Sequence, residues 1–186
     1  MTSPHPKRKE GLTTAVTFNQ IRNAIGIITE IMEEVYGKEI QASAVEKEKA
    51  IIERLRDMGK RVVDTYINYW QPGYSGLDQM LIQIYHEVFN ARVQVMQPAD
   101  FQTVRKDFKG KKIFIVETTK CPLCKAKRAT NIAGCEVLLG AVEAFFKELH
   151  ERLPNMEVPL LKAGDVVETK TRGDSKCVHR YILERL

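Results

Sequence analysis

The chain has 186 residues, a length that suits one domain with its own hydrophobic core. Hydrophobic residues make up 44% and charged residues 28% of it, an ordinary balance that excludes a wholly disordered protein. No apolar run approaches the roughly 18 residues of a membrane-spanning helix, and no apolar stretch follows the basic N-terminus as in a secretory signal. We therefore expect a soluble, cytoplasmic protein without a transmembrane segment. Residues 1–12 are expected to form a flexible basic tail, and residues 13–186 a single domain.

The net charge of +5 comes partly from this tail and partly from lysines and an arginine between positions 109 and 128. A basic patch of this kind attracts nucleic acid or an anionic membrane surface. Few aromatic residues are interleaved with it, and no nucleic-acid-binding motif surrounds it. We therefore expect no nucleic-acid partner.

The first predicted helix begins at Thr17, which has Gln20 in the reciprocal position of a capping box, and it ends before Gly37. Apolar residues recur between these ends at spacings of three and four. The apolar stripe is wider than one packing partner needs, which is typical of a deeply buried helix or of a helix shared with a second subunit.

Two further helices are predicted in the first half of the chain. One begins at Ser43, which has Glu46 in the capping-box position, and ends at Pro72 and Gly73. The next is expected to open at Ser75 and to keep its apolar residues on one face as far as position 89.

The second half of the chain predicts strands around one long helix. Alternation at 92–95 indicates a half-buried strand, and the apolar run 113–116 indicates a buried one. A helix is expected over 130–153. Two last strands, one with residues 166–169 and one beginning at Cys177, flank a turn at 172–175. The order predicts an α+β fold, in which an antiparallel sheet of about four strands is packed against four main helices.

The cysteines are the residues with the most distinctive chemistry. Without an export signal, four cysteines argue against disulfides and favour metal binding or redox work. Cys121 and Cys124 form a C-x-x-C turn that brings two thiolates together, and Cys135 and Cys177 would complete the tetrahedral set that Zn²⁺ prefers. Unliganded reduced thiols and a redox dithiol at the C-x-x-C turn are the alternatives.

Two other side chains are alternative metal ligands. His179 lies two residues after Cys177, so both point to the same face of a strand, and Glu168 offers a carboxylate. The sequence contains no nucleotide-binding glycine loop, nucleophile elbow or paired-histidine motif. We therefore assign no catalytic residues and expect a binding protein rather than an enzyme.

The C-terminal third resembles the 4-vinyl reductase-type small-molecule (hydrocarbon) binding domain, whose superfamily includes the TRAPP vesicle-tethering subunits. The residues that carry the resemblance run from Cys135 through Gly140 to Phe146, and continue with Glu168, Gly173–Asp174 and Cys177. The stretch Met58–Gly59–Lys60–Arg61 is similar to both groups. Thr171 departs from the pattern, since a cysteine is expected there and threonine is a poor zinc ligand.

The resemblance implies a TRAPP/4-vinyl reductase-like fold, a structural zinc ion and a homodimer that forms through the first two helices. It implies an apolar small-molecule ligand held between helices and sheet, which makes the protein a sensor or carrier. The alternative that it implies is a TRAPP-like scaffold subunit that works through protein partners. Candidate ligand contacts are the aromatic residues of the helices, namely Tyr66, Tyr69, Trp70, Tyr85, Phe89, Phe145 and Phe146. Aromatic residues at helical spacing are also typical of a plain core.

Overall fold

The structure is a computed structural model that describes residues 43–68, 76–96, 112–121, 123–124, 131–154 and 158–184, and the single positions 28, 31, 34 and 35. Those four single positions are helical and belong to the first predicted helix. The rest of that helix and the predicted tail lie outside the described residues. Tyr69 and Trp70 also lie outside them.

Four strands form one antiparallel sheet with the order β1-β2-β4-β3. The described elements are α2 (Ala44–Tyr66), α3 (Leu77–Gln83), the π-helical segment η1 (Ile84–Val88), β1 (Gln94–Met96), β2 (Ile113–Thr118), α4 (Glu136–Arg152), β3 (Leu161–Glu168), the short 3-10 helix η5 (Lys170–Arg172) and β4 (Cys177–Leu183). The predicted α+β class and four-stranded antiparallel sheet are confirmed. The described part of the chain holds three complete α-helices, and the fourth expected helix, the first in sequence, lies mostly outside it. None of its helices is long and apolar enough to cross a bilayer.

The start of α2 is the one predicted from the sequence. The Ser43 N–H donates to Glu46 Oε2 at 2.9 Å, and the Glu46 N–H donates to Ser43 Oγ at 3.3 Å, which completes a capping box. The helix ends at Tyr66, earlier than predicted. Pro72 marks only the last position that a helix could reach, and nothing in the pattern requires the helix to extend that far.

The starts of the other two helices differ from the prediction. The N-cap of α3 is Gly76 rather than Ser75, and it makes no side-chain capping bond. Helix α4 begins at Glu136 rather than near 130, with Cys135 in the N-cap position. Ile132 and Ala133 are buried in the core although they precede the helix. Their burial extends the apolar pattern into the turn before the helix. The pattern alone therefore does not show where the turn ends and the helix begins.

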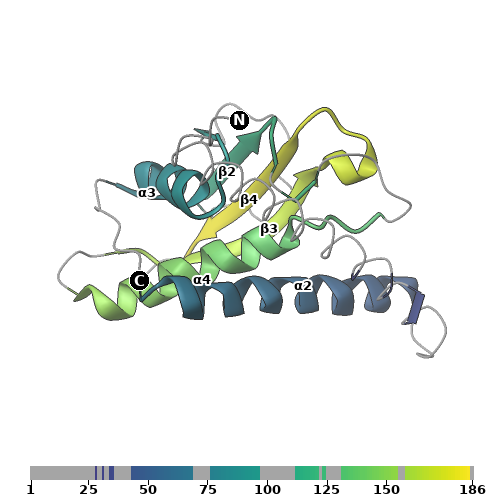
Figure 1. Cartoon of the computed structure of the whole chain (residues 1–186), viewed down its shortest axis with the longest axis horizontal. Helices are drawn as coiled ribbons and strands as arrows, with labels where there is room; N and C mark the ends of the chain where they lie inside the picture. Colours follow the sequence, from purple (N-terminus) through teal and green to yellow (C-terminus); the bar gives the residue numbers. More distant parts are fainter. Residues whose placement is uncertain are drawn as a thin grey trace, which may run out of the picture.

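The sheet has one face toward the helices and a smaller apolar cluster on the other face. Phe114 and Val116 of β2 belong to the main core, whereas Ile113 and Ile115 pack with Val178 in the second cluster. This division follows from the alternation of side chains along a strand. Figure 1 shows α2 and α4 lying side by side along one side of the sheet.

Helices α2 and α4 touch backbone to backbone where Gly59 faces Gly140. A Cβ atom added at Gly59 would lie 2.0 Å from the carbonyl oxygen of Val137, and one added at Gly140 would lie 2.1 Å from that of Arg56. Only hydrogen fits in this space, so the two glycines set how closely the helices approach. Near this contact the Arg56 side chain reaches from α2 to Glu136 of α4 and to the backbone of β3.

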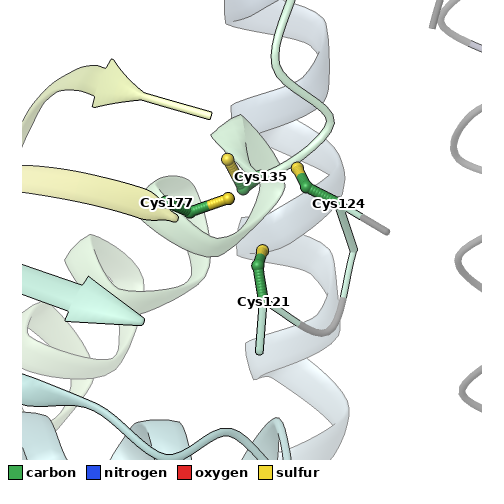
Figure 2. Close-up of side chains that lie close together, drawn as sticks. All are labelled: Cys121, Cys124, Cys135 and Cys177. Atoms are coloured by element: carbon green, nitrogen blue, oxygen red, sulfur yellow. The ribbon is translucent and has the colours of Figure 1, made fainter. Parts of the chain in front are cut away.

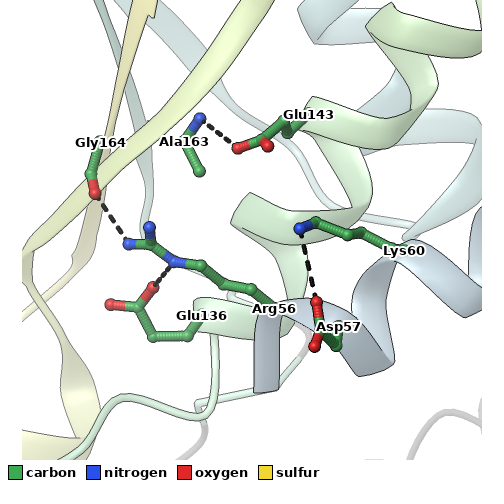
Figure 3. A network of polar contacts seen from close by, with 7 residues as sticks. All are labelled: Arg56, Asp57, Lys60, Glu136, Glu143, Ala163 and Gly164. Carbon is green, nitrogen blue, oxygen red and sulfur yellow. Dashed lines mark hydrogen bonds and ion pairs between the residues drawn. The ribbon is translucent and has the colours of Figure 1, made fainter. Parts of the chain in front are cut away.

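β3 is the last strand in the order of the described sheet, and side chains of other elements bind several of its backbone groups (Figure 3). The Ala163 N–H donates to Glu143 Oε2 of α4 at 2.8 Å, and Arg56 of α2 donates to the Gly164 carbonyl at 2.7 Å. The Arg56 Nε also donates to Glu136 Oε2 at 2.8 Å. Arg172 donates to two further carbonyls of the strand at 3.0 Å each. The helices are thereby anchored to the sheet edge by polar contacts.

Candidate metal centre

The four cysteines meet at one end of the sheet, although they are spread over more than fifty residues of sequence. Cys121 and Cys124 belong to the segment after β2, Cys135 is the N-cap of α4, and Cys177 is the first residue of β4. Their sulfur atoms all lie within 4.8 Å of one another. Figure 2 shows the four side chains directed toward a common point.

The sheet register explains why these cysteines converge. Thr118 at the end of β2 pairs with Cys177 at the start of β4, so the chain leaving β2 passes directly beside Cys177. The carbonyl of Cys135 accepts the Leu138 N–H at 2.9 Å and the Leu139 N–H at 3.4 Å, which fixes this residue on the first turn of α4. Three elements therefore bring their thiols to one place without any covalent link.

All four cysteines are free thiols, and none is more than 5% exposed. Burial raises the pKa of the Cys121 and Cys135 thiols well above the usual value. Hydrogen bonds from neighbouring thiols, with that from Cys121 the largest, lower the pKa of Cys177 and lower that of Cys124 to about 6. The cluster thus favours a mixture of thiolate and thiol, which a cation would convert to thiolates.

The size of the cluster suits a single ion. A zinc–sulfur bond of about 2.3 Å in a tetrahedron places the sulfur atoms about 3.8 Å apart, which lies within the observed limit of 4.8 Å. An iron–sulfur cluster places several metal and sulfide atoms between its thiolates and holds them further apart. Four thiolates fill the tetrahedral shell and leave no open position for a substrate or a reactive water molecule.

Neither of the alternative ligands, His179 and Glu168, belongs to this group of donor atoms in the described part of the chain. His179 is completely buried, and its Nδ1 lies 2.7 Å from the Tyr85 hydroxyl, which lies 2.6 Å from the Tyr181 hydroxyl. Its Nε2 has no hydrogen-bond partner among the described residues. Burial raises the pKa of both tyrosines, so their hydroxyl groups stay protonated.

The structure adds a residue that sequence reasoning missed. Thr169, directly after β3, is completely buried, and its hydroxyl lies 3.4 Å from the Cys124 sulfur. The Lys170 N–H points to the Cys177 sulfur at 3.5 Å. A threonine before a turn is a common local signal, since its hydroxyl accepts a backbone N–H two residues later, as here from Thr171. Nothing in that signal indicates a neighbouring thiol.

Five of the aromatic candidates for ligand contact lie among the described residues. Tyr85, Phe89, Phe145 and Phe146 belong to the main hydrophobic core, whereas Tyr66 is exposed. A groove of about 290 Å³ lies between α4 and the start of β3, and none of these aromatic residues lines it. The lining residues are Glu143, Lys147, His150, Glu151, Leu160, Leu161, Lys162 and Glu184. Five of these eight residues are glutamate or lysine.

Comparison with solved structures shows which known fold this chain resembles. A trafficking protein particle complex subunit 3 from Naegleria fowleri, crystallised with covalently bound palmitic acid, matches with a TM-score of 0.56. The match covers 91% of this chain and 96% of that one, at 11% sequence identity. The fold is TRAPP-like. This confirms the expected TRAPP-like fold, while membership of the superfamily and the 4-vinyl reductase part of the resemblance stay predictions. No protein-family model matches the sequence, and a search of curated proteins gives no match.

Proposed function

We propose that the chain is a non-catalytic scaffold subunit with a TRAPP-like fold, which binds protein partners and whose four cysteines hold one structural zinc ion. The observation that carries the metal part is the convergence of four buried sulfur atoms within 4.8 Å. The ion would be held by Cys121, Cys124, Cys135 and Cys177, and it would link the segment after β2, the start of α4 and the start of β4. Reduced thiols of this kind fit a reducing compartment such as the cytoplasm.

Metal analysis of protein purified without chelator tests the zinc site. We expect one zinc per chain, released stepwise as a mercurial reagent modifies four thiols. Cobalt(II) in place of zinc should give the intense thiolate charge-transfer absorption of a tetrahedral four-sulfur site. A chain that is folded, metal-free and unchanged in stability when zinc is added or chelated would contradict the proposal.

The proposal of a protein partner rests on exposed apolar residues of the first helix. Ile28, Ile31 and Val35 follow each other at spacings of three and four, on one helical face, and are 37%, 53% and 41% exposed. Val62 and Tyr66, one turn apart on α2, are also exposed. We propose that these residues form the interface of a homodimer through the first two helices. The similarity to a subunit of a trafficking complex supports an assembly through such surfaces.

Light scattering coupled to gel filtration measures the oligomeric state. We expect a dimer for the wild type and a monomer for Ile31→Glu, because a buried interface cannot accept an unpaired charge. Arg92→Glu, at an exposed position before β1, is the matched control and should remain dimeric. A pull-down that recovers a stable complex with a different subunit would favour a hetero-oligomer. A monomeric wild type without any partner would contradict the proposal.

A small apolar ligand is the second candidate function, and the palmitic acid bound to the Naegleria protein favours it. In the present chain a thioester would need one of the four cysteines, so acylation would remove a ligand from the metal site. Mass spectrometry distinguishes a chain with an acylated cysteine from one that holds only zinc. An adduct that hydroxylamine removes under denaturing conditions, together with a loss of zinc, supports acylation. Native spectra that show only zinc count against a bound apolar molecule.

A further inference from the structure

We propose that Thr169 is an outer-shell hydrogen-bond donor to the four-cysteine site and orients its thiolates around the metal. This inference rests on the proposed zinc site and adds a positioning residue to it. The Thr169 oxygen lies 3.4 Å from the sulfur of Cys124 and 3.8 Å from those of Cys135 and Cys177. One hydroxyl group therefore contacts sulfur atoms that arrive on three different segments of the chain.

The backbone around Thr169 holds its side chain in this place. The Thr169 N–H donates to Asp174 Oδ2 at 2.7 Å, and the Thr169 carbonyl accepts N–H groups from Arg172 at 3.0 Å and Asp174 at 3.2 Å. Gly173 completes the turn with a φ of 100°, a left-handed conformation that favours glycine. The turn between β3 and β4 thus fixes the threonine against the sulfur atoms.

The direction of the hydroxyl proton follows from its other partner. The Thr171 N–H donates to the Thr169 oxygen at 3.2 Å and occupies one of its lone pairs. Metal-bound thiolates carry no proton and can only accept hydrogen bonds. The hydroxyl proton is therefore directed at sulfur, with Cys124 as the nearest acceptor.

This donor matters because the site is buried and would be strongly negative. Four thiolates around a divalent cation leave a net charge of −2 in surroundings that exclude water. Besides Thr169, the Lys170 N–H, at 3.5 Å from the Cys177 sulfur, is a donor to this charge. Removal of an outer-shell partner typically weakens metal binding about 10- to 100-fold. Thr171→Val offers a matched control, because Thr171 is also buried and its contact to Thr169 uses only the backbone N–H.

The experiment measures zinc affinity by competition with a chromogenic chelator, for the wild type and for Thr169→Ser, Thr169→Ala and Thr171→Val. The serine and alanine variants differ only by the hydroxyl oxygen. We expect Thr169→Ala to bind zinc at least about 10-fold more weakly than Thr169→Ser, whose affinity stays close to that of the wild type. Thr171→Val should bind like the wild type. The cobalt(II) charge-transfer band should also shift in Thr169→Ala, because its energy reports the electron density on sulfur.

The outcomes separate the two proposals. If the wild type binds neither zinc nor cobalt(II), the metal site itself is wrong. If the wild type binds zinc and the serine and alanine variants have equal affinities and equal cobalt spectra, the role of Thr169 is overturned. Should Thr169→Ala fail to fold, Thr169→Val replaces it against the same serine variant, since valine keeps the shape of threonine without the hydroxyl.

Discussion

Replacing Gly59 with alanine tests the backbone contact between α2 and α4. The new Cβ would lie 2.0 Å from the Val137 carbonyl oxygen and 2.7 Å from the Ala141 nitrogen. Both atoms belong to the backbone of α4, so no side-chain rotation can relieve the contact. Heavy atoms settle about 3.5 Å apart, which means that the helices must separate locally by about 1.5 Å.

Two opposing terms set the size of the effect. Overpacking of this kind costs about 1–3 kcal/mol and sometimes more, while the better helix propensity of alanine offsets up to about 1 kcal/mol. Because the obstacle is backbone, we expect an overpacking cost in the upper part of the range of about 1–3 kcal/mol. After the gain in helix propensity, this gives a net loss of about 2 kcal/mol in the free energy of unfolding. For a chain of this size that corresponds to a melting temperature lowered by about 4–8 °C.

Urea denaturation followed by circular dichroism measures this loss, with Glu53→Ala at an exposed position of α2 as the control. Gly140→Ala should destabilise to a similar extent, since its Cβ would lie 2.1 Å from the Arg56 carbonyl oxygen. The double variant should lose less than the sum of the single variants, because one separation of the helices relieves both contacts. A Gly59→Ala protein as stable as the wild type would refute the close packing described above.

The remaining predictions concern two polar contacts. Arg56→Ala leaves the Glu136 carboxylate buried without its guanidinium partner, and denaturation should show a loss of about 3 kcal/mol in the free energy of unfolding. The additional change Glu136→Gln should restore most of this loss. Equal losses in the single and the double variant would contradict the ion pair. Hydrogen bonds from Ser43 lower the pKa of Glu46. The stabilisation from this contact is therefore present above the pKa of the unfolded chain and is lost as the pH falls through the folded-state pKa. NMR titration should find the Glu46 pKa below that of an unperturbed glutamate in the wild type and closer to it in Ser43→Ala; identical values would contradict the capping box.

Local signals in the sequence predicted several elements of the fold well. The capping box at Ser43 placed the start of α2, and the apolar run at 113–116 placed β2, because both depend on residues that are neighbours in sequence. The start of α4 was predicted too early, since buried turn residues such as Ile132 continue the helical pattern. The contact between Gly59 and Gly140 could not be predicted from the sequence, because the residues around a helical glycine do not show which residue it packs against.

The candidate metal centre was predicted only in part by reasoning from sequence. The C-x-x-C spacing identified Cys121 and Cys124, and the preference of zinc for four ligands added the other two cysteines. Their convergence depends on the pairing of Thr118 with Cys177, a contact that no local signal indicates. Thr169 was missed for the same reason, since its importance arises from the sulfur atoms that surround it rather than from its neighbours in the chain.

The covered edge of β3 limits how this protein can associate with others. An exposed strand with free N–H and carbonyl groups invites another chain to extend the sheet, and such pairing is a common route to aggregation. Here Glu143 accepts the Ala163 N–H, and Arg56 and Arg172 donate to three carbonyls of β3, so a peptide that pairs with these groups would have to displace the side chains. Extension of the sheet by strand pairing at these groups is therefore disfavoured.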